Sequence, residues 1–450
     1  MPTGGAIERF ALKKLEDWKV SKHRKPLILK GVRQVGKTWL LKEFGRRYYK
    51  NTAYFNFDEN PELRSLFETT KDVERILQNL IYASGQPIEP EETFVVFDEI
   101  QDCPNVINTM KYFCENAPQY HIACAGSLLG IALAQPSSFP VGKVNFMQID
   151  PMTFSEFLLA NGDSNLVSYL NSIHDLAPIP EAFFNPLAER LKMYYVTGGM
   201  PEPVAMWTQH RDIQAMEQSL SDILDAYERD FSKHPKITEF PKISMIWRSV
   251  PSQLARENKK FLYKVVKPGA RAREYEDALR WLVNARLVHK IYCSSSPGLP
   301  ISAYDDLSAF KLYLADVGLL RKLSHLSHSA FSEGSRLFTE FKGALTENYV
   351  LQSLLPQLEV TPRYWSRLNP SYEVDFIIQH ENELFPIEVK AETNIASRSL
   401  QKFKELFADR IKLRVRFSLN NLRLDGDILN IPLFLADKTN DLIELAVHGL

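Results

Sequence analysis

The chain has 450 residues, of which hydrophobic residues make up 45% and charged residues 24%. These values are ordinary for globular proteins, and the length suffices for two to four domains with full-sized cores. A formal net charge of −1 excludes an overall attraction to nucleic acid, so contacts with a polyanion require local basic patches. The four cysteines show no CxxC spacing, and no apolar run reaches the ~18 residues of a membrane-spanning helix. We therefore expect a soluble cytoplasmic protein with reduced thiols and no membrane partner.

The first predicted strand, at residues 26–29, leads into the octapeptide GVRQVGKT at residues 31–38. This octapeptide satisfies the pattern GxxxxGK[ST], and a strand before it and a helix after it are the context of a phosphate-binding loop. The glycines allow backbone amides to turn inward, and the helix N-terminus adds the positive end of its dipole. Lys37 is expected to reach the β- and γ-phosphates, and Thr38 to bind Mg²⁺. The predicted nucleotide contacts of this loop are Gly31, Arg33, Gln34, Val35, Gly36, Lys37, Thr38 and Trp39.

A second apolar strand, at residues 93–97, ends in the acidic pair Asp98 and Glu99. Acids at the carboxyl end of a buried parallel strand are typical of the second motif of phosphate-loop ATPases. We expect Asp98 to hold Mg²⁺ and Glu99 to orient and polarise the attacking water. Capping of the following helix by the two acids is the alternative. Residues 54–58 predict a further strand between the two motifs.

A third apolar strand, at residues 121–125, runs into Gly126 and Ser127. A polar side chain at the end of a neighbouring strand can contact the γ-phosphate or the attacking water, which makes Ser127 a candidate sensor and nucleotide contact. A simple Gly-Ser turn explains the same residues. The guanine-reading tetrapeptide NKxD is absent from the sequence, so ATP is favoured over GTP, and a GTPase or a nucleotide kinase fits poorly.

The pattern of elements changes three times along the chain. Residues 1–150 alternate strands and amphipathic helices, which is typical of a parallel α/β sheet. Residues 151–238 are predicted to form a helical lid subdomain. Residues 239–330 contain helical patterns followed by a strand, a turn and another strand, which favour a winged-helix module. Residues 331–450 return to a mixed α/β pattern.

A basic segment lies between Arg256 and Arg273, where seven basic residues accompany the single acid Glu257. Phe261 and Tyr263 are interleaved with these charges. Such clustering indicates contact with a phosphate backbone, and DNA is therefore an expected partner of the winged-helix module. A solvated charged face remains the alternative interpretation.

The last predicted site combines Asp375, at the start of an apolar strand, with Glu388 and Lys390 on the next strand. Residues two apart on a strand point the same way, so the three side chains could converge on one metal. The spacing matches the D…ExK signature of the restriction-endonuclease-like superfamily, in which two acids hold Mg²⁺ and the lysine activates or positions water. Glu347, on a preceding helix, would add a further acid. Charged residues that alternate on a half-exposed hairpin are the alternative.

With these regions assembled, the chain resembles a large prokaryotic family of AAA-type ATPases that join an ATPase core to a C-terminal domain of unassigned function. The resemblance covers nearly the whole length. It rests on GVRQVGKT, VVFDEIQ (95–101), AGSLLG (125–130), PMTFSEF (151–157), GGMPEPV (198–204), LYLADVGLL (312–320), EVDFII (373–378) and IEVK (387–390).

The resemblance implies roles for individual residues. Lys37 and Thr38 would be the Walker A pair, Asp98 and Glu99 the Walker B pair, and Ser127 the sensor. Lys143 stands where similar proteins tend to show arginine. Lysine, unlike arginine, cannot bind a phosphate through two parallel hydrogen bonds. This weakens the expectation that the residue acts as an arginine finger, which is a side chain that completes the nucleotide site of a neighbouring subunit.

The expected fold class is therefore α/β, with a P-loop NTPase parallel sheet core, a helical lid, a winged-helix module and a C-terminal restriction-endonuclease-like (PD-(D/E)xK) domain. The expected function is that of an ATP-binding, ATP-hydrolysing AAA-type protein that is associated with DNA and carries a nuclease-like domain. The expected cofactors are ATP and Mg²⁺, and self-association as a homo-oligomer is a further expectation. The alternative is a nucleotide-dependent switch that binds a protein or DNA partner without nuclease activity.

Overall fold

The computed structural model describes residues 8–127, 130, 142–233, 236–331, 336–367, 371–391 and 397–448. The chain forms two compact units, which are considered separately. The smaller unit consists of residues 8–150 and 284–287, and the larger unit contains residues 151–283 and 288–450.

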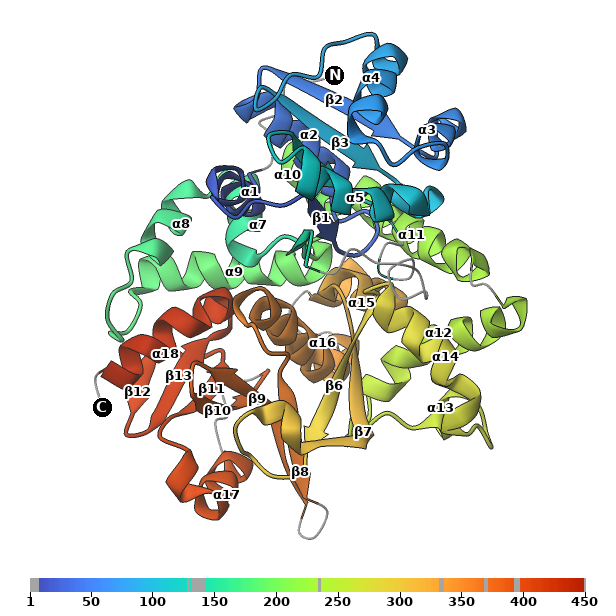
Figure 1. Cartoon of the computed structure of the whole chain (residues 1–450). Helices are drawn as coiled ribbons and strands as arrows, with labels where there is room; N and C mark the ends of the chain where they lie inside the picture. The colour runs from blue at the N-terminus through green and yellow to red at the C-terminus, as the bar shows by residue number, and fades with distance from the viewer. Residues whose placement is uncertain are drawn as a thin grey trace. The chain divides into compact units, whose positions relative to one another are not determined.

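The smaller unit is an α/β unit with a five-stranded sheet in the order β2-β3-β4-β1-β5, and every pair of neighbouring strands is parallel (Figure 1). The strand β4 thus separates β1, which precedes the phosphate loop, from β3, which ends in the acidic pair. The elements, in order, are α1 Ala11–Val20, β1 Leu27–Lys30, α2 Lys37–Tyr48, β2 Asn51–Asn56, η1 Pro61–Arg64, α3 Ser65–Glu68, α4 Val73–Ser84, β3 Thr93–Asp98, η2 Ile100–Asp102, α5 Pro104–Asn116, β4 His121–Cys124 and β5 Asn145–Gln148.

The centre of this sheet is buried on both faces. All six residues of β3 are buried, as expected for a central strand of a parallel sheet that helices cover. The ring of Phe97 lies 5.5 Å from that of Phe67 and 5.9 Å from that of Phe55, so aromatic side chains fill one side of the sheet. Because this core is closely packed, the carboxyl ends of the strands hold their polar residues in fixed positions.

In the larger unit, the described elements between residues 151 and 284 are all helical. They are α7 Phe154–Ala160, α8 Ser164–Asn171, α9 Glu181–Thr197, α10 Pro201–His210, α11 Ile213–Asp230, η3 Phe231–Lys233, η4 Ile237–Glu239, α12 Phe240–Leu254, α13 Tyr263–Val266 and α14 Ala272–Asn284. A capping box starts α7, since the Thr153 hydroxyl accepts from the Glu156 amide and the Glu156 carboxylate accepts from the Thr153 amide.

The same unit contains an eight-stranded mixed sheet in the order β12-β13-β11-β10-β9-β8-β6-β7. Its hairpin β6–β7 joins the other strands through a parallel contact between Cys293 and Tyr364, so the sheet continues across residue 330, where the sequence predicts a domain boundary. The elements are β6 Val288–Ser294, η5 Ile301–Tyr304, β7 Asp305–Leu314, α15 Val317–Leu323, η6 His328–Phe331, α16 Arg336–Leu354, η7 Leu355–Gln357, β8 Arg363–Arg367, β9 Tyr372–His380, β10 Glu383–Val389, α17 Arg398–Leu406, η8 Ala408–Arg410, β11 Arg414–Ser418, β12 Arg423–Asp425, β13 Ile428–Pro432, η9 Leu433–Lys438 and α18 Thr439–His448.

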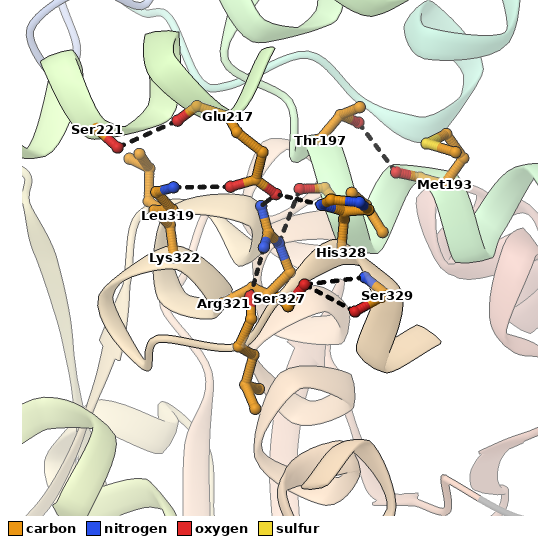
Figure 2. A network of polar contacts seen from close by, with 12 residues as sticks. Met193, Thr197, Glu217, Ser221, Leu319, Arg321, Lys322, Ser327, His328 and Ser329 are labelled. Atoms are coloured by element: carbon orange, nitrogen blue, oxygen red, sulfur yellow. Dashed lines mark hydrogen bonds and ion pairs between the residues drawn. The ribbon is translucent and has the colours of Figure 1, made fainter. Parts of the chain in front are cut away.

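A buried ionic cluster ties three helices of the larger unit together (Figure 2). The fully buried guanidinium of Arg321, on α15, lies 2.7 Å from the carboxylate of Glu217 on α11 and donates to the carbonyl oxygen of Val196 on α9. Glu217 also pairs with Lys322 at 2.8 Å. Removal of Glu217 would leave the buried charge of Arg321 without this countercharge, which costs about 3 to 5 kcal/mol. The cluster therefore fixes the helical part of this unit.

Candidate functional site

The phosphate loop between β1 and α2 has the backbone that its glycines permit. A Cβ atom on Gly31 would lie 2.3 Å from the carbonyl oxygen of Ile149, so a larger residue would force β1 away from the segment that follows β5. Gly36 precedes the first residue of α2 and has a φ of 91°, a conformation that side chains disfavour. The loop therefore leads into a helix N-terminus, as a phosphate-binding loop requires.

Lys37 is the first residue of α2, and its side chain is buried. Its ammonium donates to the carbonyl oxygens of Gly31 and Val32, each at 2.9 Å, so it lies inside the curve of the loop. Burial lowers the pKa of Lys37 to about 8, although Glu99 and Asp98 oppose this shift. A buried cation beside the loop amides is suited to a polyphosphate, whose charge would replace the weak carbonyl partners.

Thr38 and Asp98 come from the two predicted motifs and lie in direct contact. The Thr38 hydroxyl donates to Oδ2 of Asp98 at 2.7 Å, and the Tyr54 hydroxyl donates to the same oxygen at 2.8 Å. Asp98 is 2% exposed. A hydroxyl and a carboxylate side by side at the end of a phosphate loop fit the oxygen ligands of Mg²⁺, because the ion also takes substrate phosphates and water.

Glu99 lies between β3 and β4 and receives two hydrogen bonds. Its Oε2 accepts from Nε2 of Gln101 at 2.6 Å and from the backbone amide of Ser127 at 3.1 Å. Burial alone would raise the pKa of Glu99, but these hydrogen bonds and the charge of Lys37 lower it below its ordinary value. The carboxylate is therefore held ionised and oriented, which suits a group that positions water.

The structure thus brings together Lys37, Thr38, Asp98, Glu99 and Ser127, and their roles in nucleotide binding and hydrolysis stay predictions. It also adds residues that the sequence analysis missed. Tyr54 and Gln101 contact the acidic pair, as described above. Arg9 is buried and donates to the carbonyl oxygen of Val35 at 3.0 Å and to that of Asp150 at 2.8 Å, so it fixes the loop from outside.

No local signal identifies Arg9, whose partners lie 26 and 141 residues away. Gln101 could have been suspected, because it follows the acidic pair directly in VVFDEIQ. Lys143 stands where similar proteins tend to show a candidate arginine finger. It pairs with Glu115 at 2.8 Å within the same unit.

The D…ExK residues lie on the predicted hairpin of the larger unit. Asp375 is on β9, Glu388 is on β10, and Lys390 follows β10. Ile387 pairs with Phe376, so the register extended by one residue places Glu388 opposite Asp375. The Asp375 carboxylate accepts from the backbone amide of Val389 at 2.8 Å, and Lys390 pairs with Glu388 at 2.7 Å.

Glu347, on α16, is closely paired with Lys259, which belongs to the basic segment, and also accepts from the Tyr313 hydroxyl at 3.1 Å. Burial and then the charge of Glu347 raise the pKa of Asp375, although Lys311 and Lys259 oppose the shift. Burial would likewise raise the pKa of Glu347, but the two lysines lower it. Lysines therefore already balance the charge beside these two acids.

A divalent ion fits this arrangement poorly. Glu347 and Asp375 have partners for their oxygens, and only Oε2 of Glu388 is buried without a hydrogen-bond partner among these groups. Within the ranges that the structure describes, no group of three or more His, Cys, Asp or Glu residues is arranged to hold a metal. The roles of Glu347, Asp375, Glu388 and Lys390 in metal binding or catalysis stay predictions.

Three parts of the chain match family models. Residues 23–158 match an AAA domain, residues 188–330 match a domain of unknown function (DUF8612), and residues 342–434 match another (DUF4143). The AAA match coincides with the phosphate loop, the acidic pair and the parallel sheet, and it supports an AAA-type P-loop ATPase for this part of the chain. A comparison with curated proteins found no match.

Several solved structures are distantly similar to the chain. A Walker-type ATPase of Pyrococcus abyssi is 15% identical over 70% of this chain and 95% of its own, with a TM-score of 0.44. The Orc1 protein of Aeropyrum pernix in complex with DNA is 12% identical over 72% and 93%, with a TM-score of 0.28. The RuvB branch migration motor of Thermotoga maritima is 15% identical over 63% and 89%, with a TM-score of 0.30. Such distant likenesses assign neither substrate nor partner.

None of the helices in the described part of the chain is both long and apolar enough to span a bilayer.

Proposed function

We propose that the smaller unit binds ATP together with Mg²⁺ and hydrolyses the γ-phosphate. The observation that carries this proposal is the contact between Thr38 and Asp98, which joins the ends of two separately predicted motifs at 2.7 Å beside the buried Lys37. The match of residues 23–158 to an AAA domain supports it. Adenine is favoured because the guanine-reading motif is absent from the sequence.

Each residue has a defined task in this proposal. The loop amides and Lys37 would hold the β- and γ-phosphates, and Lys37 would exchange its carbonyl partners for phosphate oxygens. Thr38 and Asp98 would hold Mg²⁺, which supplies positive charge to the phosphates when it is bound. Glu99 would orient the attacking water and accept its proton, while Ser127 and Gln101 keep the carboxylate in place.

The test is the release of phosphate from ATP by the purified chain. Lys37→Ala removes the phosphate contact and is expected to lower the rate at least 100-fold. Glu99→Gln is expected to bind ATP but to hydrolyse it as slowly as Lys37→Ala does, because the amide cannot accept the proton of the attacking water. Arg46→Ala, at an exposed position of the same helix, is the matched control and is expected to keep the wild-type rate. Equal turnover by Lys37→Ala and by wild type would refute the assignment.

For the larger unit we propose that it is a partner-binding part whose contacts respond to the nucleotide. DNA is the partner that its basic segment suits, because Lys264, Lys267, Arg271 and Arg273 are exposed there. The proposal also assigns a winged-helix module and a nuclease-like domain to this unit. The positions of Asp375 and Glu388, opposite each other on the hairpin of β9 and β10, support the nuclease-like domain. The pairing of Glu347 with Lys259 favours binding without cleavage.

The experiment is a gel shift with duplex DNA at several salt concentrations, with and without ATP. Reversal of charge at Lys264 and Lys267 is expected to weaken binding and to reduce its salt dependence. The same charge reversal at Lys13 and Lys14, in the other unit, is the control. Nicking of plasmid that requires Mg²⁺ and is lost in Asp375→Ala would instead establish the nuclease.

A further inference from the structure

A tyrosine of β2, to which the sequence assigns no role in the site, contacts the carboxylate of Asp98. The Tyr54 hydroxyl donates to Oδ2 of Asp98 at 2.8 Å, and the same oxygen accepts from the Thr38 hydroxyl at 2.7 Å. Tyr54 lies on β2, Thr38 on α2 and Asp98 at the end of β3. Three elements therefore meet at one carboxylate oxygen, and β2 belongs to neither of the two predicted motifs.

The pairing of β2 with β3 explains why a tyrosine can make this contact. The two strands are parallel, with Tyr54 opposite Val96 and Asn56 opposite Asp98. Residues two apart on a strand point to the same face of the sheet, so Tyr54 and Asp98 share a face. Their offset along the strands is about 6.6 Å. The long tyrosine side chain covers this offset, whereas a serine or a threonine would be too short.

The ring of Tyr54 is also in contact with the helix that follows the phosphate loop. The ammonium of Lys42 lies 3.8 Å from the centre of that ring. Lys42 comes four residues after Thr38 on α2, so the two side chains lie on the same face of the helix. A cation over the face of an aromatic ring is attracted to it. The hydroxyl of Tyr54 is therefore held in place from both β2 and α2.

Three donors orient the carboxylate of Asp98. In addition to the two hydroxyls, the backbone amide of Glu99 donates to Oδ1 of Asp98 at 3.0 Å. An ionised carboxylate has about four acceptor positions, so these donors leave about one position for a further partner. Burial, and then the charge of Asp98, raise the pKa of Tyr54, so its hydroxyl stays a neutral donor. The direction in which the carboxylate can bind something else is thereby fixed.

We propose that Tyr54 is a positioning residue of the Mg²⁺ site, whose hydroxyl keeps Asp98 in the orientation in which the carboxylate holds the ion. This inference rests on the proposed nucleotide site and adds to it a residue from outside both motifs. Loss of such an outer partner lowers metal affinity by roughly 10- to 100-fold. The expected phosphate contacts of Lys37 and the loop amides do not involve Tyr54. Its hydroxyl therefore matters for the contribution of Mg²⁺ to nucleotide binding, and not for nucleotide binding without the ion.

The test is calorimetry of the whole chain with a non-hydrolysable ATP analogue, once with Mg²⁺ and once with a chelator. The measured quantity is the magnesium factor, which is the ratio of the two affinities for the analogue. Tyr54→Phe removes only the hydroxyl and is expected to reduce the magnesium factor about tenfold. Its affinity in the chelator is expected to equal that of wild type. Tyr82→Phe, at an exposed position in the same unit, is the matched control and is expected to behave as wild type does.

A second variant does not depend on the fold tolerating a change at Tyr54. Lys42→Met, at an exposed position, releases the ring but keeps the hydroxyl. It is expected to reduce the magnesium factor in the same direction as Tyr54→Phe, but by less. Thermal unfolding without ligands shows whether each variant is folded.

Two results would overturn the proposal. An equal magnesium factor in Tyr54→Phe and in wild type would show that the hydroxyl does not serve the ion. A larger factor in the variant would show that the hydroxyl competes with the ion for Asp98. Absence of analogue binding by wild type under both conditions would instead refute the proposed nucleotide site itself, so the two failures are distinguishable.

Discussion

Gln101 connects the candidate water-positioning group to the candidate sensor. Its Nε2 lies 2.6 Å from Oε2 of Glu99 and 3.4 Å from Oγ of Ser127, while its Oε1 is buried without a hydrogen-bond partner among the described residues. A Cβ atom on Gly126 would lie 2.3 Å from that Oε1, so the glycine leaves room for the amide. The amide is therefore placed to hold two groups that come from different strands.

Gln101→Ala is expected to lower kcat for ATP about tenfold and to leave KM nearly unchanged. The physical reason is that the amide orients Glu99 toward the transition state but has no predicted contact with the nucleotide itself. Steady-state phosphate release at several ATP concentrations separates the two constants. Gln214→Ala, at an exposed position in the larger unit, is the control. A rise in KM with an unchanged kcat would contradict the role assigned to Gln101.

Several strands of the ATPase core can be predicted from local sequence patterns, but the edge strand that completes the sheet cannot. The strands β1, β3 and β4 are visible in the sequence as short apolar runs beside glycines or acids. The sequence does not predict the strand β5, because Asn145–Gln148 carries no apolar pattern. The lack of a pattern agrees with the structure, in which none of these residues is fully buried. The strand forms since the edge of β1 is open to pairing, with Leu27 opposite Asn145. Tertiary pairing of this kind has no local signal.

Two motifs to which the sequence alone assigns no role contact each other in the structure. The amide of Gly199, in GGMPEPV, donates to Oδ2 of Asp316, in LYLADVGLL, at 2.6 Å. Asp316 is fully buried and also accepts from the Leu319 amide at the start of α15. A Cβ atom on Gly198 would lie 2.0 Å from the same carboxylate. The motifs therefore form a structural junction, which a single sequence cannot reveal because 117 residues separate its two sides.

The roles of the residues in the basic segment also cannot be predicted from the sequence, because these residues differ in burial and in partners. The sequence groups Lys259 with the exposed basic residues, but the structure pairs it with Glu347, 88 residues away. Phe261 is likewise buried and stacks on Phe310, with ring centres 5.2 Å apart, so it is not a platform for bases. Composition identifies such a segment, whereas the burial of each side chain decides its role.

Lys259→Met is expected to reduce the free energy of unfolding by about 3 kcal/mol, because Glu347 would remain buried beside Asp375 without its nearest countercharge. Mn²⁺ is expected to restore part of this loss in the variant and to leave wild type unchanged, since only the variant offers uncompensated carboxylates. Thermal unfolding with and without Mn²⁺ measures both effects. Lys260→Met, at the adjacent position, is the control. Equal stabilisation of wild type and Lys259→Met by Mn²⁺ would show that the lysine does not take the place of a metal.

At the scale of the whole molecule, the two compact units differ in the ligands that they are proposed to bind. The smaller unit carries the candidate nucleotide site, and the larger unit carries the basic segment and the D…ExK acids. A ligand stabilises only the unit that it binds, by an amount that grows with the logarithm of its concentration. Unfolding of the intact chain can therefore report nucleotide binding by one unit separately from the stability of the other.

Calorimetry of the full-length chain is expected to show two unfolding transitions, of which only one responds to ATP. Mg²⁺ with ATP at about 100 times its Kd adds about 2.7 kcal/mol to one unit, which for a unit of this size raises its midpoint by roughly 5 to 10 °C. This shift is expected to vanish in Lys37→Ala, and the midpoint of the other transition is expected to stay unchanged when ATP is added. A single transition that moves as a whole with ATP would mean that the two units unfold together, and the separate treatment of their stabilities would then be wrong.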